Sequence, residues 1–374
     1  MEYRVHQKTG EKVSLLGLGC MRLPKVDPTK DAIDIEAANA EIDAAYQNGI
    51  TYFDTAWPYH GGQSETVIGA ALKKYPRESF FLADKMPAWA LETLEDREKV
   101  FSKQLEKCQV DYFDFYLMHA VQPSNWDKYE EFKVYEFLNQ KKQEGKIKRL
   151  GFSFHGDIPL LKKVLAAHEW DFVQIQLNYL DWTMQDAKTQ YELISQAGLQ
   201  CIIMEPVRGG ALADLCPSAN EMLKSATPER SIASWAIRYA ASLPNVLCVL
   251  SGMSNMEQLQ DNISTMRPFC ALSDEEHTLL QSALQEYRKA STIPCTACRY
   301  CMPCPAGVEI PQMFKLYNDK YAFSKSKNSL KSAYEAFGEG VAAQCVSCGA
   351  CLEKCPQSIE IPQKMAMITS LVQE

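Results

Sequence analysis

Short apolar runs alternate with segments of helical spacing from residue 13 to about 265. The segment SETVIGAALKK (64–74) places apolar residues on one helix face, with Ser64 expected as its N-cap, and ERSIASWAIRYAAS (229–242) has the same spacing. Eight runs read as strands: LLGLGC (15–20), TYFDTA (51–56), FFLADKM (80–86), YFDFYLMHA (112–120), KRLGFSFHG (148–156), FVQIQLN (172–178), QCIIMEPV (200–207) and VLCVLSG (246–252). Eight strands that alternate with helices predict an α/β fold of the (β/α)8 TIM-barrel type.

The alternative fold is an open, doubly wound sheet. That fold needs a glycine-rich turn that opens a helix after the first strand, and LGLGCM followed by Arg-Leu-Pro does not open one. We expect the residues before 13 to form a hairpin at the barrel floor, and LSDEEHTLLQSALQEYR (272–288) to form a linking helix capped by Ser273. The predicted domains are therefore a barrel (1–270), a linking helix (271–292) and a tail (293–374).

The tail carries eight cysteines in two short motifs. Each of CTACRYCMPCP (295–305) and CVSCGACLEKCP (345–356) has three cysteines spaced three apart, followed by a Cys-Pro pair. CPAGVEIPQMF from Cys304 also matches CPQSIEIPQKM from Cys355, which predicts two similar half-units that face one another. The segment between them (315–337) is basic and helix-prone, so its lysines form a solvated face or guide an acidic electron carrier.

Three thiolates on one tight loop can bind three irons of a cubane, and the fourth ligand comes from elsewhere. In two-cluster ferredoxins the cysteine before the proline ligates the other cluster. Two 4Fe–4S clusters are therefore predicted, one on Cys295, Cys298, Cys301 and Cys355, the other on Cys345, Cys348, Cys351 and Cys304. Zinc and a disulfide framework are the alternatives. The first motif ends CxxCP, one residue shorter than the CxxxCP that ends the second. This shorter spacing affects which cysteine sulfur binds which iron.

The tail resembles the dicluster ferredoxin domains of anaerobic oxidoreductases. The roughly forty residues between the motifs read as helical, so the likeness is to a small, mostly α-helical ferredoxin. The other six cysteines are expected to be buried and reduced: Cys20, Cys108, Cys201, Cys216, Cys248 and Cys270.

The net charge and the apolar content indicate which classes of partner the protein does not bind. A net charge of −8 argues against nucleic acid, and no apolar run reaches the length of a membrane span. The N-terminal segment lacks the apolar core of a signal peptide. We therefore expect a cytoplasmic protein with no membrane or nucleic-acid partner.

Polar residues lie at the ends of three successive predicted strands. TYFDTAWPYH offers Asp54 and Tyr59, FFLADKM offers Lys85, and FYLMHA offers His119. Singly, each has a structural explanation as a cap, a packing ring, a solvated lysine or a satisfied histidine. Because active sites of such barrels lie at the C-terminal strand ends, the four together predict a catalytic site.

Their chemistry suits the reduction of a carbonyl. The ammonium of Lys85 would favour the phenolate of Tyr59 and lower its pKa, and Asp54 would hold Lys85 in place. Tyr59 could then give a proton to a carbonyl oxygen that His119 orients. The reverse direction oxidises an alcohol.

The motifs DTAWPYHGGQSE, LADK and LMH resemble the aldo–keto reductases, whose Asp-Tyr-Lys-His tetrad falls at these places. With GLGCMRLP, GFSFHG, VQIQLN and SGMSNMEQLQDN the resemblance spans about residues 13–265, and the whole chain is similar to the iron–sulfur branch of that family. The resemblance implies a nicotinamide dinucleotide, NADP(H) or NAD(H), and leaves a flavin open. Ser153, Gln174 and Asn178 would hold its carboxamide, with Met204 against the ring.

The same resemblance assigns the phosphate contacts. Arg208, Gly209 and Gly210 would meet the pyrophosphate, while Gly252, Gln258, Asp261 and Asn262 occupy the segment for the adenosine phosphate, where many reductases carry Lys and Arg. Mouth loops would add six aromatic or histidine residues that contact the substrate: Trp57, His60, Trp89, Trp126, His155 and Trp182.

The predicted function is hydride transfer between the nicotinamide and a small carbonyl or alcohol, with Tyr59 as proton donor and the clusters serving electron transfer or structure. A ferredoxin or flavodoxin is the candidate electron partner. The alternatives are a redox-sensing nucleotide-binding protein that docks through its iron–sulfur tail, and a flavin-linked electron-transfer protein.

Overall fold

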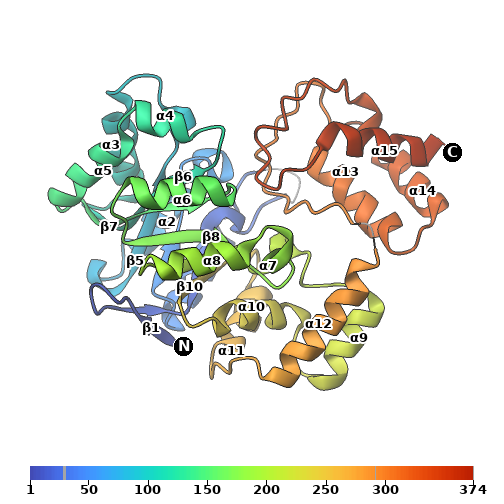
Figure 1. Ribbon diagram of the computed structural model, residues 1–374, viewed down its shortest axis with the longest axis horizontal. Helices are drawn as coiled ribbons and strands as arrows, with labels where there is room; N and C mark the ends of the chain where they lie inside the picture. Colours follow the sequence, from blue (N-terminus) through green and yellow to red (C-terminus); the bar gives the residue numbers. More distant parts are fainter. Residues whose placement is uncertain (28–30, 291, 374) are drawn as a thin grey trace. The chain divides into compact units, whose positions relative to one another are not determined.

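The computed structural model describes residues 1–27, 31–290 and 292–373. Its parallel strands close into a barrel in the order β10-β3-β4-β5-β6-β7-β8-β9 (Figure 1). The predicted barrel is confirmed, since each predicted strand overlaps one observed strand: β3 (Leu16–Gly19), β4 (Tyr52–Asp54), β5 (Phe81–Met86), β6 (Phe113–Val121), β7 (Ile147–Phe154), β8 (Phe172–Gln176), β9 (Gln200–Met204) and β10 (Val246–Ser251).

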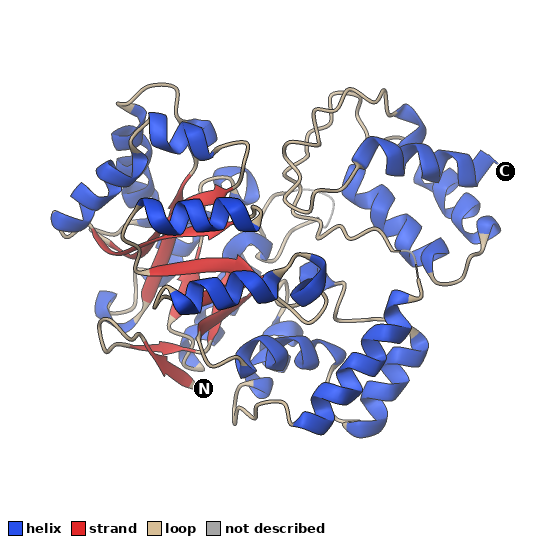
Figure 2. Cartoon of the chain, viewed as in Figure 1, coloured by secondary structure: helices blue, strands red, loops and turns tan. Residues whose placement is uncertain are grey.

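Helices alternate with these strands, as Figure 2 shows. Their bounds are α1 (Ile35–Gln47), α2 (Ser64–Leu72), α3 (Asp96–Cys108), α4 (Trp126–Glu131), α5 (Val134–Gln143), α6 (Ile158–Ala167), α7 (Asp181–Met184), α8 (Ala187–Gln196), α10 (Ile232–Ser242) and α11 (Met256–Thr265). The prediction that Ser64 caps α2 is wrong. Gln63 is the cap residue, and the hydroxyl of Ser64 donates to the carbonyl of Cys20 because Ser64 is buried against that loop.

The expected hairpin precedes the barrel. Strands β1 (Tyr3–Val5) and β2 (Lys12–Ser14) pair antiparallel. The amide of Ser14 donates to Thr51 Oγ1 at 3.0 Å, just before β4, and that of Gln7 donates to Gln200 Oε1 at 2.8 Å, at the start of β9. Both contacts lie at N-terminal strand ends, so the hairpin covers the barrel floor.

The barrel interior is filled by side chains. Tyr52, Phe115 and Phe172 belong to its buried core, and their rings pack edge to face. Five of the six scattered cysteines are buried as expected, but Cys270 is exposed because it lies in the loop before α12. The barrel mouth at the opposite ends of the strands is thus the place where polar side chains converge.

The chain divides into two compact units, residues 1–207 with 234–272 and residues 208–233 with 273–374. The second unit contains α9 (Pro217–Ala226), which packs against α12 (Asp274–Arg288). Ser273 caps α12 as predicted, in a capping box with Glu276. The division takes a loop and helix of the barrel sequence into the second unit, and the domain boundaries drawn from the sequence stay a prediction.

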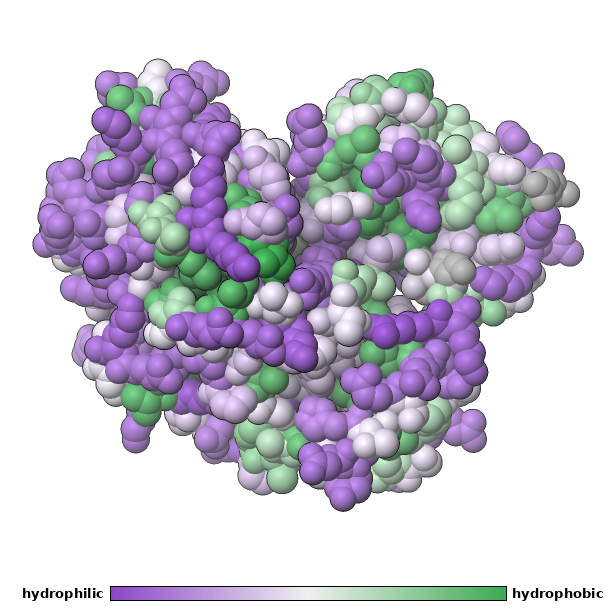
Figure 3. Space-filling model, viewed as in Figure 1, coloured by the Kyte–Doolittle hydropathy of each residue, from purple (hydrophilic) through white to green (hydrophobic). Residues whose placement is uncertain are grey.

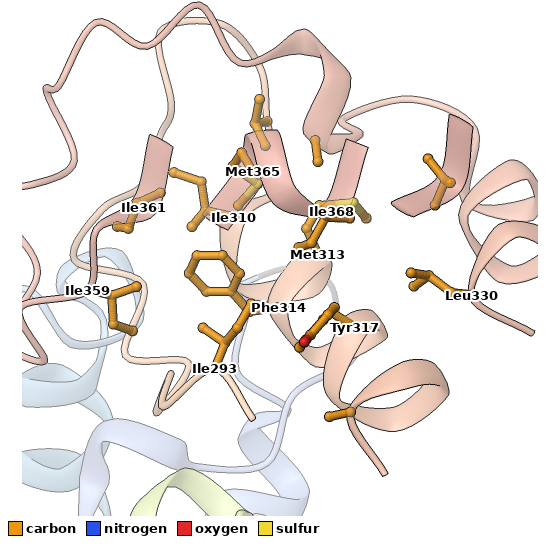
Figure 4. Packing of buried hydrophobic residues seen from close by; sticks show 14 residues of the cluster. Ile293, Ile310, Met313, Phe314, Tyr317, Leu330, Ile359, Ile361, Met365 and Ile368 are labelled. Atoms are coloured by element: carbon orange, nitrogen blue, oxygen red, sulfur yellow. The ribbon is translucent and has the colours of Figure 1, made fainter. Parts of the chain in front are cut away.

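The tail is helical, as expected, and has its own hydrophobic core. Its helices are α13 (Ile310–Tyr317), the π-helical turn η6 (Asn318–Ala322), α14 (Lys327–Phe337) and α15 (Ile361–Gln373). Met313, Phe314, Met365 and Ile368 pack together at its centre (Figure 4). Within the described ranges, no helix combines the length and the apolar character that crossing a membrane requires.

Candidate active site

Lys85 lies at the centre of the barrel mouth, near the end of β5. Its Nζ donates to Asp54 Oδ1 at 2.6 Å and to the carbonyl of Thr55 at 2.8 Å, both at the end of β4. The same ammonium lies 3.2 Å from the phenol oxygen of Tyr59, in the turn that follows. All three side chains are buried, so three of the four residues expected to be catalytic form one connected group.

The acidity of Tyr59 differs from the expectation. Burial raises the pKa of its phenol well above the ordinary value, and the charges of Asp54 and Glu205 raise it further. Burial also raises the pKa of Asp54, against the opposing effect of Lys85. The expected lowering by Lys85 is therefore outweighed, and Tyr59 is a neutral phenol that keeps its proton.

His119 is the fourth member of the group. Its ring packs edge-on to that of Tyr59, with centroids 6.1 Å apart, and lies 5.0 Å from the ring of Trp89. Burial lowers the pKa of His119 well below its ordinary value, and the charges of Lys85 and His155 add to the effect. The imidazole is thus neutral and can donate one hydrogen bond without carrying charge.

The mouth residues separate into two kinds. Trp89 is 48% exposed beside His119, where a substrate could contact it. Burial lowers the pKa of His155, which sits at the end of β7, to about 4. Trp126, by contrast, is buried in α4 and belongs to the packing of that helix. Trp89 and His155 are the members of the predicted set that lie beside the catalytic group.

Three of the expected nicotinamide contacts lie on adjacent strands. Ser153 on β7 accepts a bond from the amide of Ala120 at 2.7 Å, and its hydroxyl can still donate. On β8, Gln174 Nε2 contacts the sulfur of Met204 on β9 at 3.7 Å. Gln174 Oε1 is buried and has no hydrogen-bond partner within the described residues, so it can accept from a carboxamide.

The side chain of Asn178 is engaged in hydrogen bonds within the protein. Its amide donates to Asp181 Oδ2 at 2.6 Å and to the carbonyl of Glu205 at 3.0 Å. Its oxygen accepts from the amides of Leu180 and Asp181. The side chain therefore holds the loop after β8, and this geometry gives it a supporting position behind the carboxamide site.

The last barrel unit carries the residues expected near the adenosine phosphate. Asn255 caps α11, and Gln258 Oε1 accepts from the amide of Ser254 at 2.8 Å. Asn262 is buried and donates to Ser251 Oγ, while Asp261 lies on the same helix. No Lys or Arg occurs from residue 252 to 262, so this loop offers backbone and amide groups without a cation.

The sequence reasoning missed Arg22. Its side chain covers Gly252 so closely that a Cβ there would lie 3.0 Å from Arg22 Cδ, and its guanidinium pairs with Glu205 at 3.4 Å. Arg22 follows the first barrel strand directly. Its place after a strand end was the signal that could have identified it.

Arg208, Gly209 and Gly210 belong to the second compact unit. Arg208 is buried and donates to the carbonyl of Pro294 at 3.2 Å and to Gln357 Oε1 at 3.1 Å. A Cβ on Gly209 would lie 2.2 Å from the carbonyl oxygen of Thr296, whereas one on Gly210 would meet nothing within 4 Å. The guanidinium of Arg208 is thus engaged with the segments around the cysteine motifs.

The two cysteine loops share one backbone conformation. Cys295 Sγ accepts from the amide of Ala297, which curls the first loop around its sulfur. Three pairs of corresponding residues are left-handed: Ala297 (φ 53°) with Ser347 (54°), Arg299 (65°) with Gly349 (76°), and Gly307 (74°) with Ser358 (50°). The predicted repeat is therefore present in the backbone as well as in the sequence.

The cysteines group across the repeat. Cys295, Cys298, Cys301 and Cys355 line one hollow. Burial raises the pKa of the Cys301 thiol, and the other three thiols raise it further. Among the described residues, no three His, Cys, Asp or Glu side chains are arranged to hold a single metal ion; these four cysteines instead surround a space.

The second group is built the same way. Burial raises the pKa of the Cys351 thiol, and Cys345, Cys304 and Cys348 raise it further, so these sulfurs are neighbours. Each group thus joins three cysteines of one motif to the Cys-Pro cysteine of the other. This arrangement and the left-handed loops fit the cubane ligand sets that the sequence predicted.

Comparison with known proteins agrees with both parts of the chain. The family model "Aldo/keto reductase family" matches residues 15–285, and "4Fe-4S dicluster domain" matches residues 294–360. L-galactose dehydrogenase of Arabidopsis thaliana is 28% identical over 79% of this chain and 97% of the relative. NADH-specific methylglyoxal reductase of Escherichia coli is 26% identical over 72% of this chain and 94% of the relative.

Among solved structures, an aldo-keto reductase from Bacillus halodurans in its holo form is similar in fold, with a TM-score of 0.62 and 24% identity over 76% of this chain and 96% of its own. The first family model covers well over half of the sequence. The chain belongs to the aldo/keto reductase family of oxidoreductases, and it carries a 4Fe–4S dicluster domain after the barrel.

Proposed function

We propose that this chain reduces a small carbonyl compound, or oxidises the matching alcohol, with a nicotinamide dinucleotide as hydride carrier and Tyr59 as proton donor. The observation that carries the proposal is the Lys85 ammonium, which lies 2.6 Å from Asp54 and 3.2 Å from the phenol oxygen of Tyr59. A buried cation in hydrogen-bond contact with a phenol supports proton transfer from that phenol.

Each side chain at the barrel mouth has its own role in the proposed reaction. Tyr59 gives its proton to the carbonyl oxygen, and Lys85 stabilises the phenolate that remains. Asp54 keeps the ammonium charged and directed at the phenol. Neutral His119 donates a hydrogen bond that places the carbonyl oxygen, and Trp89 supplies an apolar wall beside it. In the oxidative direction each proton moves the opposite way.

The residues present fit a nicotinamide. Ser153 and the unpartnered Gln174 Oε1 would hold the carboxamide from β7 and β8, and Met204 would lie against the ring from β9. Asn178 would support them from behind. When bound, the reduced nicotinamide supplies hydride to the carbonyl carbon.

The adenosine segment favours NAD(H) over NADP(H), because Arg22, a cation beside it, is already paired with Glu205. Gly252, Gln258, Asp261 and Asn262 offer no cation for a 2′-phosphate, and Glu257 adds a negative charge in the first turn of α11. One relative is named for NADH specificity, which agrees with this loop. Arg208, Gly209 and Gly210 complete the set that the family resemblance assigns to the pyrophosphate. Their contacts within the second unit favour a structural role.

We further propose two 4Fe–4S clusters, one on Cys295, Cys298, Cys301 and Cys355 and one on Cys345, Cys348, Cys351 and Cys304. The shared left-handed loops and the crossed grouping of the sulfurs support this assignment. When bound, the clusters supply one-electron exchange. A nicotinamide moves two electrons together, so an electron carrier outside the chain is part of the proposal.

The Tyr59→Phe variant tests the proton donor. It removes one hydroxyl and leaves the nucleotide contacts in place. We expect turnover on a carbonyl panel to fall about 10²- to 10⁴-fold, with the Kd for NADH unchanged in a fluorescence titration. Tyr75→Phe is the matched control, since it also removes one phenol hydroxyl, one that bonds Asp43 before β5 and belongs to no part of the proton-transfer group. Undiminished turnover by Tyr59→Phe would exclude the proposed donor.

A further inference from the structure

The two cysteine loops differ in exposure although their backbones match. Thr296 in the first loop is 1% exposed, whereas the corresponding Val346 in the second loop is 70% exposed. Cys298 is partly covered, while its counterpart Cys348 is exposed. The repeat thus places one cluster site under cover and the other at the surface.

The cover of the first loop comes from the same compact unit. The Gly209 backbone packs against the carbonyl of Thr296, at a distance that leaves no room for a Cβ. The Arg208 guanidinium donates hydrogen bonds to the carbonyl of Pro294, directly before Cys295, and to the side chain of Gln357, directly after the Cys355-Pro356 pair. These contacts close over the first ligand set and have no counterpart at the second loop among the described residues.

The open second loop carries apolar side chains around its exposed cysteine. Val346 and Leu352 are both among the large exposed hydrophobic residues, and Ala350 between them is exposed as well. Hydrophobic residues also reach the surface of the tail in the view of Figure 3. A small apolar patch around a redox centre is suited to a brief contact with another protein.

A basic segment precedes the second loop in the chain. Lys320, Lys325, Lys327 and Lys331 are all exposed, and no acidic residue occurs from 320 to 334. Lys327, Lys331 and Tyr334 are spaced i, i+4 and i+7 along α14, and the exposed Glu335 continues the same face. The hydroxyl of Tyr334 accepts from the amide of Ala343 at 2.8 Å, two residues before Cys345. This bond ties the C-terminal end of α14 to the segment that precedes the second loop.

We propose that the second cysteine loop and the exposed lysines of residues 325–331 form a docking surface for a small acidic ferredoxin. The lysines complement the charge of such a carrier, and the chain as a whole, at −8, does not. Val346, Ala350 and Leu352 would form the centre of the contact, and Lys325, Lys327 and Lys331 its rim. The inference rests on the proposed function only in assuming that the clusters exchange electrons.

The exchange balances one electron for one electron. A reduced ferredoxin would lose one electron, and a cluster held by Cys345, Cys348, Cys351 and Cys304 would supply the acceptor for it. No bond is made or broken and no proton moves in this step. The covered first loop would receive the electron within the protein.

Binding tests the surface without any turnover. We would measure the Kd of the iron-loaded full chain for a purified acidic 4Fe–4S ferredoxin by anaerobic calorimetry, at about 50 and about 200 mM salt. The triple variant Lys325→Glu, Lys327→Glu, Lys331→Glu should raise the Kd at least about 10-fold at the lower salt. The salt dependence that the wild type shows should shrink in the variant.

A matched control separates local from overall charge. Lys99→Glu, Lys163→Glu, Lys188→Glu changes the net charge equally at exposed lysines of the barrel helices and should leave the Kd within about two-fold of the wild type. A second probe, Val346→Ser, should weaken binding through lost apolar contact. Its iron content and electron paramagnetic resonance spectrum check that the cluster has assembled.

Three other results would each overturn the docking proposal. It is wrong if the chain binds no ferredoxin, if both lysine sets weaken binding equally, or if a flavodoxin binds while the ferredoxin does not. The Tyr59→Phe variant should bind ferredoxin like the wild type. A failure of the proposed carbonyl chemistry would therefore leave this measurement intact, and a failure of docking would leave the test of Tyr59 intact.

Discussion

Glu41 on α1 offers a direct test of the barrel's electrostatics. Its side chain is 1% exposed, and neither carboxyl oxygen has a hydrogen-bond partner within the described residues. Burial raises the pKa of this carboxyl from its ordinary 4.5 to about 8. The folded chain therefore carries Glu41 as a neutral acid at neutral pH, while the unfolded chain would ionise it.

The sign of the effect follows from proton linkage. Because the folded state holds the proton more tightly, the stability that this group contributes is present below pH 4.5 and is lost as the pH rises to about 8. Each pH unit in that window costs the folded chain about 1.4 kcal/mol. Replacing Glu41 by a permanently neutral glutamine removes this loss. We expect the stability of Glu41→Gln relative to the wild type to grow by roughly 3 kcal/mol from pH 5 to pH 8.

Urea unfolding followed by tryptophan fluorescence measures this difference. All six tryptophans lie between residues 57 and 235, so their emission follows the barrel unit that contains Glu41. Glu36→Gln is the control, because Glu36 lies on the same helix but is exposed. If the Glu41→Gln and wild-type curves ran parallel from pH 5 to 8, the carboxyl would be solvated or paired, and the reasoning from burial would be wrong.

Three further substitutions test other contacts. Lys85→Met leaves a buried carboxylate without its cation; turnover should fall at least about 10²-fold and the free energy of unfolding by about 3 kcal/mol, measured by steady-state kinetics and urea unfolding. Gly209→Ala forces a Cβ against Thr296 and should lower the free energy of unfolding by about 2 kcal/mol, with loss of iron. Gly210→Ala, whose Cβ meets no neighbour, should lower it by about 1 kcal/mol and retain iron. Equal effects of the two variants would show that the close contact with Thr296 has no such role. Cys304→Ser should halve the iron per chain and remove the resonance signal of the second cluster while the first remains, and loss of both or neither would refute the crossed ligand sets.

The barrel was predictable because its information is local and periodic. Each strand is a short apolar run, and each helix shows its own spacing, so the alternation appears in the sequence itself. Asp54, Lys85 and His119 were predicted as site residues by the same logic, since they occupy positions on strands that run to one rim. The position of Arg22 was not predicted because it lies against Gly252, which is distant in the sequence.

The acidity of Tyr59 shows a second limit. The sequence placed an ammonium near a phenol and correctly predicted that they meet, but it gave no measure of burial. In the folded chain desolvation outweighs the nearby cation, so the phenol is held neutral. The direction of a pKa shift depends on the balance of these two effects, and only the packed structure fixes that balance.

The two cysteine loops of the tail also show that burial depends on contacts that local sequence does not specify. Two motifs of nearly the same sequence adopt the same left-handed turns, so local sequence determines the loop conformation. Yet Thr296 is covered and Val346 is exposed, because Arg208 and Gly209 contact the segments around the first loop. These residues come from a segment about ninety positions earlier in the chain, where nothing in the repeat refers to them. Duplication therefore specifies two alike loops, and contacts from residues 208 and 209, outside the repeat, cover one of them while the other stays exposed.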